Sequence, residues 1–206
     1  MIDGVGFDLI KTDSIRAGPI VKYQPKRHES GKSTFVIAGG RSDALRGLGN
    51  VPATAEAGGY FEYQASGFSA KAEIRKGIGG HDGLIGEVGA RYTTDLKGIA
   101  FGERAVSFSF GPRAVVVDDK YNRSYFGIDA GQSARSGLSR YDAKGGLLSY
   151  GLGGTLVLPV SASLGIAVLG GFDRLAGDAA KSPLVRERGS RNQATIGLGL
   201  TYHFGR

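Results

Sequence analysis

Alternation of apolar and polar side chains with a period of two residues constrains the fold of this chain more than any other feature. Between 193 and 204, the even positions hold apolar residues from Ala194 to Phe204, and the odd positions hold small or polar residues from Gln193 to His203. A β-strand sends successive side chains to opposite faces, whereas a helix repeats every 3.6 residues. The pattern predicts a strand here, and it recurs along the whole chain.

Two neighbouring segments, 53–64 and 68–78, alternate apolar side chains with charged ones. In the second segment, Phe68, Ala70, Ala72, Ile74 and Ile78 lie on one face, and Ser69, Lys71, Glu73, Arg75 and Gly77 lie on the other. A soluble β-sandwich turns its polar face to water and a membrane barrel turns it inward, so the alternation alone permits both folds. Strand length and loop length must decide between them.

The alternating segments are long. We expect about nine strands of roughly 9–12 residues, which matches the length that crosses an outer membrane and exceeds the usual strand of a soluble protein. The expected strands lie near 2–10, 14–24, 53–64, 68–78, 84–94, 104–117, 147–158, 163–173 and 193–204.

The connections between these strands alternate in length. Tight links at 11–13, 65–67, 96–103 and 161–162 fall on one rim, and the other rim carries longer connections at 25–52, 118–146 and 174–192 and the short 79–83. Short turns at one rim and long loops at the other are typical of bacterial outer-membrane barrels. The sequence therefore predicts an all-β fold, a transmembrane antiparallel up-and-down β-barrel, which residues 1–206 form as a single domain.

The expected number of strands is odd, whereas barrels of this kind have an even number. No secretory signal precedes the first expected strand, although an exported protein needs one. We therefore expect that an odd number of N-terminal strands is missing together with a signal peptide. Three missing strands would give about twelve in total.

The composition fits a barrel with a crowded interior. Glycine makes up 36 of the 206 residues, far above its usual share of about 7%. Because glycine weakens ordinary helices and strands, this load suits a fold in which many side chains must be small. Cysteine is absent, which excludes disulfides, cysteine-ligated metals and a thiol nucleophile.

The formal net charge is +7, and a basic chain first suggests a polyanion such as nucleic acid. The basic residues are, however, spread along the chain among acidic ones, without a run of several in a row. The phosphates of lipopolysaccharide would serve as a polyanionic partner equally well. We expect outer-membrane lipid and lipopolysaccharide as partners, and no nucleic acid.

The segment 145–172 has no charged residue and is longer than a membrane-spanning helix requires. Pro159 interrupts it, and Leu148, Tyr150 and Leu152 keep the two-residue alternation. We therefore expect two strands here rather than a helix.

Motifs that carry chemistry are weak in this sequence. The segment 29–34 resembles the end of a phosphate-binding loop but lacks the upstream glycine, since Lys26 stands there. His28, His81 and His203 lack the spacing of a metal site. Asp118 and Asp119 could meet His28 at a rim, but the sequence supplies no set of nucleophile, base and orienting group. We expect no cofactor and no enzymatic activity.

Two of the long loops are rich in arginine. One carries Arg135 and Arg140 beside aromatic residues, and the other carries Arg186, Arg188 and Arg191 around Glu187. Arg–Glu pairs could fold these loops on themselves, although exposed pairs are common and weak. Alternatively, the guanidinium groups recognise an anion or a protein partner. These five arginines are the candidate recognition residues.

The polar face of the predicted barrel wall would line a lumen. The candidate lining residues are Glu56, Glu62, Lys71, Glu73, Arg75, Glu87, Arg91 and Arg113. Such a lumen could pass small solutes like a porin, or it could be plugged by ion pairs among these same residues.

Several spaced segments of the chain resemble the MipA/OmpV family of outer-membrane proteins. They are 16–19, 44–49, 124–127 with 132–137, and Ser182-Pro183 with 188–190. They occur in order over essentially the whole chain. The resemblance implies a signal peptide and early strands before the first residue, and we expect that these are the missing N-terminal part.

The resemblance implies an outer membrane of a Gram-negative bacterium as the location. For the MipA branch it also implies a scaffold that links a lytic murein transglycosylase to a bifunctional penicillin-binding protein in peptidoglycan synthesis. Other members of the family are described as porin-like or immunogenic. The expected function is therefore structural scaffolding, with a porin-like channel as the alternative.

Overall fold

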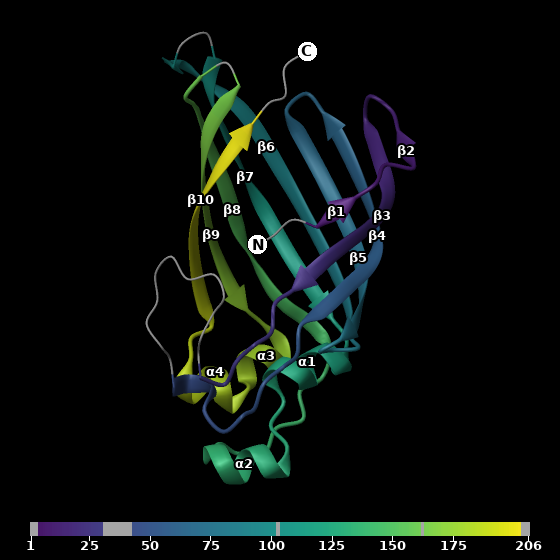
Figure 1. The fold of residues 1–206 in the computed structure, drawn as a ribbon, viewed down its shortest axis with the longest axis vertical. Coiled ribbons are helices and arrows are strands. Elements are labelled where there is room, and N and C mark those ends of the chain that lie inside the picture. Colours follow the sequence, from purple (N-terminus) through teal and green to yellow (C-terminus); the bar gives the residue numbers. More distant parts are fainter. Residues whose placement is uncertain (1–3, 31–42, 102–103, 162, 203–206) are drawn as a thin grey trace.

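The computed structural model describes residues 4–30, 43–101, 104–161 and 163–202, and it consists of one antiparallel sheet with short helices at one end (Figure 1). The strands are β1 (Val5–Gly6), β2 (Ile10–Lys11), β3 (Ile15–Gln24), β4 (Thr54–Ala65), β5 (Phe68–Gly79), β6 (Leu84–Phe101), β7 (Arg104–Val117), β8 (Gly146–Pro159), β9 (Leu164–Leu175) and β10 (Asn192–Tyr202). The helices are η1 (Asp43–Leu45), α1 (Asp119–Phe126), α2 (Ala130–Ser136), α3 (Gly177–Lys181) and α4 (Pro183–Arg188).

From β3 to β10, each strand pairs with the next one along the chain, so the sheet has the predicted up-and-down topology. It curls into a half-barrel (Figure 1), and β1 and β10 lie at the two ends of the strand order. The all-β antiparallel prediction is confirmed. Closure into a barrel of twelve strands stays a prediction.

The first and fifth expected strands differ in detail from the structure. The expected strand at 2–10 is divided into β1 and β2, which both pair with β3. Between β1 and β2, the Phe7 and Leu9 amides donate to carbonyl oxygens of β3. The tight link expected at 96–103 was wrong, because β6 continues to Phe101. A shift in register between Leu96 and Ala100 absorbs extra residues in β6, as a β-bulge does.

The 145–172 segment forms β8 and β9, as the alternation predicted. Pro159 ends β8, and the Val160 and Ser161 amides donate to the Leu164 carbonyl oxygen at 2.8 and 3.0 Å to close the turn. Among the described residues, no helix is both long enough and apolar enough to span a membrane.

The two faces of the sheet have opposite polarity, and the buried face is the charged one. Glu56, Glu73 and Arg75 are only 3%, 7% and 5% exposed, whereas Ile74 and Leu200 on the opposite face are 62% and 76% exposed. Side chains crowd on the inside of a curved sheet, so the polar face lies inside and the apolar face outside. A soluble protein hides such apolar residues from water. This polarity is that of a wall whose outer face meets lipid.

The long connections lie at one end of the sheet, and the short turns lie at the other (Figure 1). The long connections form short helices and the segments between them, and we call this part the cap: residues 25–30, 43–53, 118–145 and 176–191. Two apolar clusters hold the cap together. One joins strand ends to α3 and α4 through Ile85, Val117, Leu148, Leu175, Ala179, Ala180 and Val185, and the other lies within the cap and contains Leu48, Ile128, Leu138 and Leu184.

Candidate functional site

A cluster of ion pairs lies on the polar face of the sheet, close to the cap. Three cations from β3 and β5 meet three carboxylates from β4, β5 and β6, and we call this set the wall cluster: Lys22, Lys71, Arg75, Glu56, Glu73 and Glu87. The Arg75 guanidinium lies 2.9 Å from Glu56 and 3.2 Å from Glu87, and it also contacts Glu73. The charges balance, which is how a protein tolerates ionised groups that are buried.

His81 joins the wall cluster to the cap. Its backbone N–H donates to Thr54 Oγ1 at 3.1 Å, and its ring Nδ1 accepts the Gly83 N–H at 3.3 Å. Nε2 is then the ring nitrogen that carries the proton, so it donates to Glu56 Oε1, which lies 3.3 Å away. A buried histidine thereby closes the cap end of the cluster.

Two tyrosines of α1 cover His81. The ring centroids of Tyr121 and Tyr125 lie 4.8 and 5.6 Å from that of His81, both in edge-on geometry. Burial raises the pKa of the Tyr121 phenol far above its ordinary value, because it is shielded from water. The side chains of α1 thus lie directly over the charged side chains of the wall.

A second ion pair crosses the polar face from β7 to β9. Arg113 Nε donates to Asp173 Oδ1 at 2.8 Å, and a second hydrogen bond makes the pair bidentate. The strand register places Gly151 between these two residues. A Cβ at Gly151 would lie 2.2 Å from the Phe172 carbonyl oxygen and 2.4 Å from Asp173 Oδ1. Glycine here leaves the space through which the arginine reaches its partner.

The eight candidate lumen residues all fall on the same face of the sheet by strand register. Most of them pair with one another or with a neighbour, and Arg16 extends the network to Glu62 at 3.9 Å. Arg91 is exposed and forms no hydrogen bond or ion pair with any residue that the structure describes. Lys22 is part of the wall cluster, His81 bonds to it and Asp173 pairs with Arg113, but the sequence did not single these three out as lumen residues.

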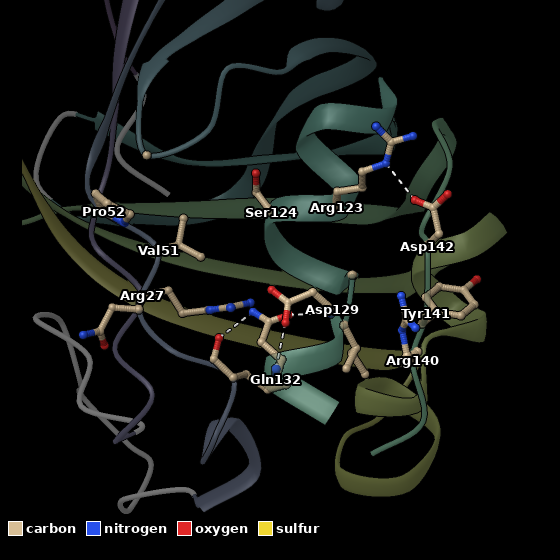
Figure 2. Close-up of a pocket in the computed structure, with 15 residues that line it drawn as sticks. Arg27, Val51, Pro52, Arg123, Ser124, Asp129, Gln132, Arg140, Tyr141 and Asp142 are labelled. Atoms are coloured by element: carbon tan, nitrogen blue, oxygen red, sulfur yellow. Dashed lines mark hydrogen bonds and ion pairs between the residues drawn. The ribbon is translucent and has the colours of Figure 1, made fainter. Parts of the chain in front are cut away.

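The cap contains a cavity of about 690 Å³, which we call the cap cavity (Figure 2). Two short backbone bridges frame it, one between Arg27 and Val51 and the other between Ile128 and Tyr141. The bridge hydrogen bonds measure 2.8 to 3.0 Å, so both walls are fixed by the main chain. Three arginines and two aspartates line the cavity: Arg27, Arg123, Arg140, Asp129 and Asp142.

The five candidate recognition arginines have different roles in the cap. Arg188 donates to the carbonyl oxygens of Ala44 and Arg46 at 3.3 and 3.1 Å, and Arg191 donates to that of Ala180 at 3.1 Å. These two arginines tie the cap segments together through backbone carbonyls rather than through Arg–Glu pairs.

The other three, Arg135, Arg140 and Arg186, are exposed and have no hydrogen-bond or ion-pair partner in the described part of the chain. Of the five, only Arg140 lines the cap cavity.

Arg27 also lines the cap cavity and was not among the candidates. It donates to the Tyr125 carbonyl oxygen at 2.7 Å, and its guanidinium lies 5.7 Å from the centroid of the Tyr125 ring. Its Nε is buried without a hydrogen-bond partner among the described residues. The only local signal is that Lys26 and Arg27 are adjacent basic residues shortly after the end of a strand.

The acidic residues considered for a catalytic site hold the cap backbone instead. Asp118 caps α1 by accepting the Tyr121 N–H at 3.0 Å, and Asp119 accepts the Gly145 N–H at 2.7 Å. Within the described residues, no group of three or more potential ligands could hold a metal ion. The 31–34 part of the loop that resembles a phosphate-binding loop lies outside the described residues, as do His203 and Phe204.

Comparisons with known proteins agree with this architecture. A family model described as "MltA-interacting protein MipA" matches residues 1–204. Outer membrane protein OmpV of Vibrio cholerae serotype O1 is 38% identical over 84 residues, which cover 41% of this chain and 31% of that protein. The matched part of the chain thus spans about a third of the length of this relative. No solved structure matches.

Proposed function

Because this chain belongs to the MltA-interacting protein MipA family of outer-membrane proteins, we propose that it is a structural scaffold that docks a cell-wall enzyme on its periplasmic side. The proposed partners are a lytic murein transglycosylase and a penicillin-binding protein, so that a murein hydrolase and a murein synthase are held together during peptidoglycan assembly. The match of the family model over residues 1–204 carries this proposal. We also propose that the chain forms a single barrel domain and that it has no enzymatic activity.

The short-turn end of the sheet is the surface that would face such partners, because short turns of outer-membrane barrels lie in the periplasm. We call residues 12–14 and 64–67 the periplasmic rim. All of these residues except Thr12 line a hollow of about 570 Å³, together with Phe68, Ser69 and Thr93. Ser66 and Gly67 have φ angles of 43° and 82°, as a two-residue hairpin turn requires. The rim is therefore a fixed polar surface on which a soluble enzyme can dock.

A binding measurement tests the scaffold. The intact protein, purified from outer membranes in a neutral detergent, should bind an immobilised lytic murein transglycosylase of the same bacterium. Replacing Asp13 and Gln64 by arginine should weaken this binding at least tenfold, because both side chains are exposed on the rim and the change reverses its charge. Glu187→Arg, an exposed site in α4 at the opposite end, is the control and should leave the binding unchanged.

Two results would count against the scaffold. One is the lack of binding to any murein hydrolase or synthase by the folded wild-type protein. The other is an equal loss of binding in the rim variant and in the Glu187→Arg control, which would indicate a general charge effect.

A porin-like channel is the second candidate, and it rests on the charged side chains of the polar face. The wall cluster argues against an open channel, since its cations and carboxylates neutralise one another and α1 lies over them. Planar-bilayer conductance separates the two functions. A folded protein that inserts and passes no ions would exclude the channel, and stable unitary currents would support it.

A further inference from the structure

The cap cavity holds two arginines that have no carboxylate partner among the described residues. Arg27 bonds only to a backbone carbonyl and an aromatic ring, and Arg140 makes no hydrogen bond or ion pair with any described residue. The third arginine, Arg123, is neutralised by Asp142 at 2.7 Å and Asp119 at 3.2 Å. Three arginines and two aspartates line the cavity, so its lining carries a net charge of +1, and the two guanidinium groups without a carboxylate partner are the source of that excess.

The position of Arg27 is costly unless something else compensates it. Its Nε is shielded from water and lacks an acceptor, and a buried donor left unpaired costs about 1–3 kcal/mol. Loss of water contact also lowers the pKa of the guanidinium. Figure 2 shows its side chain reaching into the cavity, with Arg140, Tyr141 and Asp142 on the opposite wall. An anion between these walls would meet the outer end of the Arg27 guanidinium, which lines the cavity, rather than the shielded Nε.

The rest of the cavity suits a ligand that is more than a simple anion. Leu48, Val51, Pro52 and Ile128 give part of the wall an apolar surface. Asp129 Oδ1 accepts the Gln132 backbone N–H at 2.8 Å. The other carboxylate oxygen of Asp129 can therefore accept a hydrogen bond from a ligand. Apolar patches beside hydrogen-bonding groups match the faces and hydroxyl groups of a sugar ring.

We propose that the cap cavity binds an acidic saccharide, a sugar unit that carries a phosphate or carboxylate group, with Arg27 and Arg140 holding the anionic group. Guanidinium groups bind phosphate and carboxylate through paired, charge-assisted hydrogen bonds. Asp129 and the apolar wall contact the sugar. The volume of about 690 Å³ is in the range of small-ligand sites and admits a ligand of a few sugar units at most.

Two sources could supply this chemistry, because long loops of outer-membrane barrels face the outside of the cell. One is the phosphorylated saccharide of lipopolysaccharide in the same membrane. The other is a free acidic saccharide in the surrounding medium. The site would recognise the same group in both.

Isothermal titration with glucose 6-phosphate tests the site on the intact protein in a neutral detergent. Arg140→Ala should weaken binding at least tenfold, because a hydrogen bond to a charged group is lost. Arg140 is exposed and makes no hydrogen bond or ion pair with a described residue, so its removal should leave the fold intact. Arg186→Ala removes another exposed, unpaired cap arginine outside the cavity and should bind like the wild type. Arg27→Lys keeps the charge but loses the planar fork, so it should also weaken binding.

Competing probes identify which part of the ligand is recognised and where it comes from. Glucose and inorganic phosphate should each bind at least tenfold more weakly than glucose 6-phosphate. Displacement of glucose 6-phosphate by lipopolysaccharide, but not by dephosphorylated lipopolysaccharide, assigns the membrane source. Failure of lipopolysaccharide to displace it assigns the free saccharide, and both results support the proposal.

Three results would overturn it. They are the absence of glucose 6-phosphate binding by the folded protein, equal binding of inorganic phosphate, and an equal loss in Arg140→Ala and Arg186→Ala. None of them bears on the periplasmic rim, so the scaffold proposal and this one fail separately.

Discussion

At the scale of single residues, Arg75 occupies the centre of the wall cluster, where its guanidinium contacts Glu56, Glu73 and Glu87. Removing the cation would leave buried carboxylates without their main partner. Breaking a buried ion pair from one side costs about 3–5 kcal/mol. Arg75→Ala should therefore lower the free energy of unfolding by about that amount, measured by urea titration of the folded protein in detergent micelles.

Arg91→Ala is the matched control, because Arg91 lies on the same face but is exposed and has no partner in the described chain. Its effect should stay within about 0.5 kcal/mol. Equal stability of the two variants would show that the wall cluster does not stabilise the fold.

Gly151 is an example of why the sequence is rich in glycine, because its position has no room for a side chain. A methyl group there would clash with the Phe172 carbonyl oxygen and with Asp173. Gly151→Ala should destabilise the protein by about 1–3 kcal/mol, the usual cost of overpacking, in the same urea titration. Gly170→Ala is the control, since a Cβ at Gly170 would meet no atom within 4 Å. A Gly151→Ala protein as stable as this control would contradict the crowded-interior explanation.

At the scale of elements, the cap depends on contacts between segments that are distant in the sequence. Asp178 of α3 accepts the Lys144 N–H at 2.9 Å, and this hydrogen bond, with help from Lys181, lowers the pKa of its carboxyl group. Asp142 has a lowered pKa because of Lys144 and Arg123. Carboxyl groups with lowered pKa values stabilise the fold above their ordinary value of 3.8 and lose this effect as the pH falls through the folded value.

The cap should therefore loosen in acid, below about pH 3.8. Amide hydrogen exchange of Lys144, after correction for its intrinsic pH dependence, should show less protection at pH 3 than at pH 6. In Asp178→Asn the side chain cannot ionise, so protection of this amide should hardly change between the two pH values. A wild-type protein that keeps full protection at pH 3 would rule this mechanism out.

The strands could be predicted from the sequence because each is encoded by local alternation of side chains. The cap helices could not, since α1 to α4 are short, and helices of that length are stabilised by tertiary packing rather than by their own sequence. Local start signals exist, namely Asp118 before α1, the capping box of Asp129 and Gln132 at α2, and Pro183 in the first turn of α4, but signals of this kind also occur in turns.

The wall cluster and the cap cavity also differ in how far the sequence could predict them. Alternation predicted every charged residue of the wall cluster except Lys22, whereas Arg27 contacts Tyr125, which is 98 positions away. His81 likewise meets Glu56 and Tyr121 only in the folded chain. Contacts at such separation have no local pattern, so the sequence did not indicate the cap cavity.

At the scale of the whole molecule, the neutralised wall cluster and the cap beside it favour a closed interior over an open pore. The ionic groups pair with each other, and Tyr121 and Tyr125 cover them from the cap side. Ions would have to displace these tyrosines and enter a network that is already neutral. The folded protein should therefore pass little or no current in planar bilayers.

Removing the tyrosine cover should raise any residual conductance. In the double variant Tyr121→Ala and Tyr125→Ala, water gains access to His81 and the wall cluster, so ion passage should become measurable at a voltage where the wild type is silent. Phe110→Ala is the control, because Phe110 is 49% exposed on the apolar face and its loss leaves the polar face intact. A wild-type protein that conducts as strongly as the double variant would mean that the cap does not close the interior, and the porin-like function would then replace the scaffold as the better account.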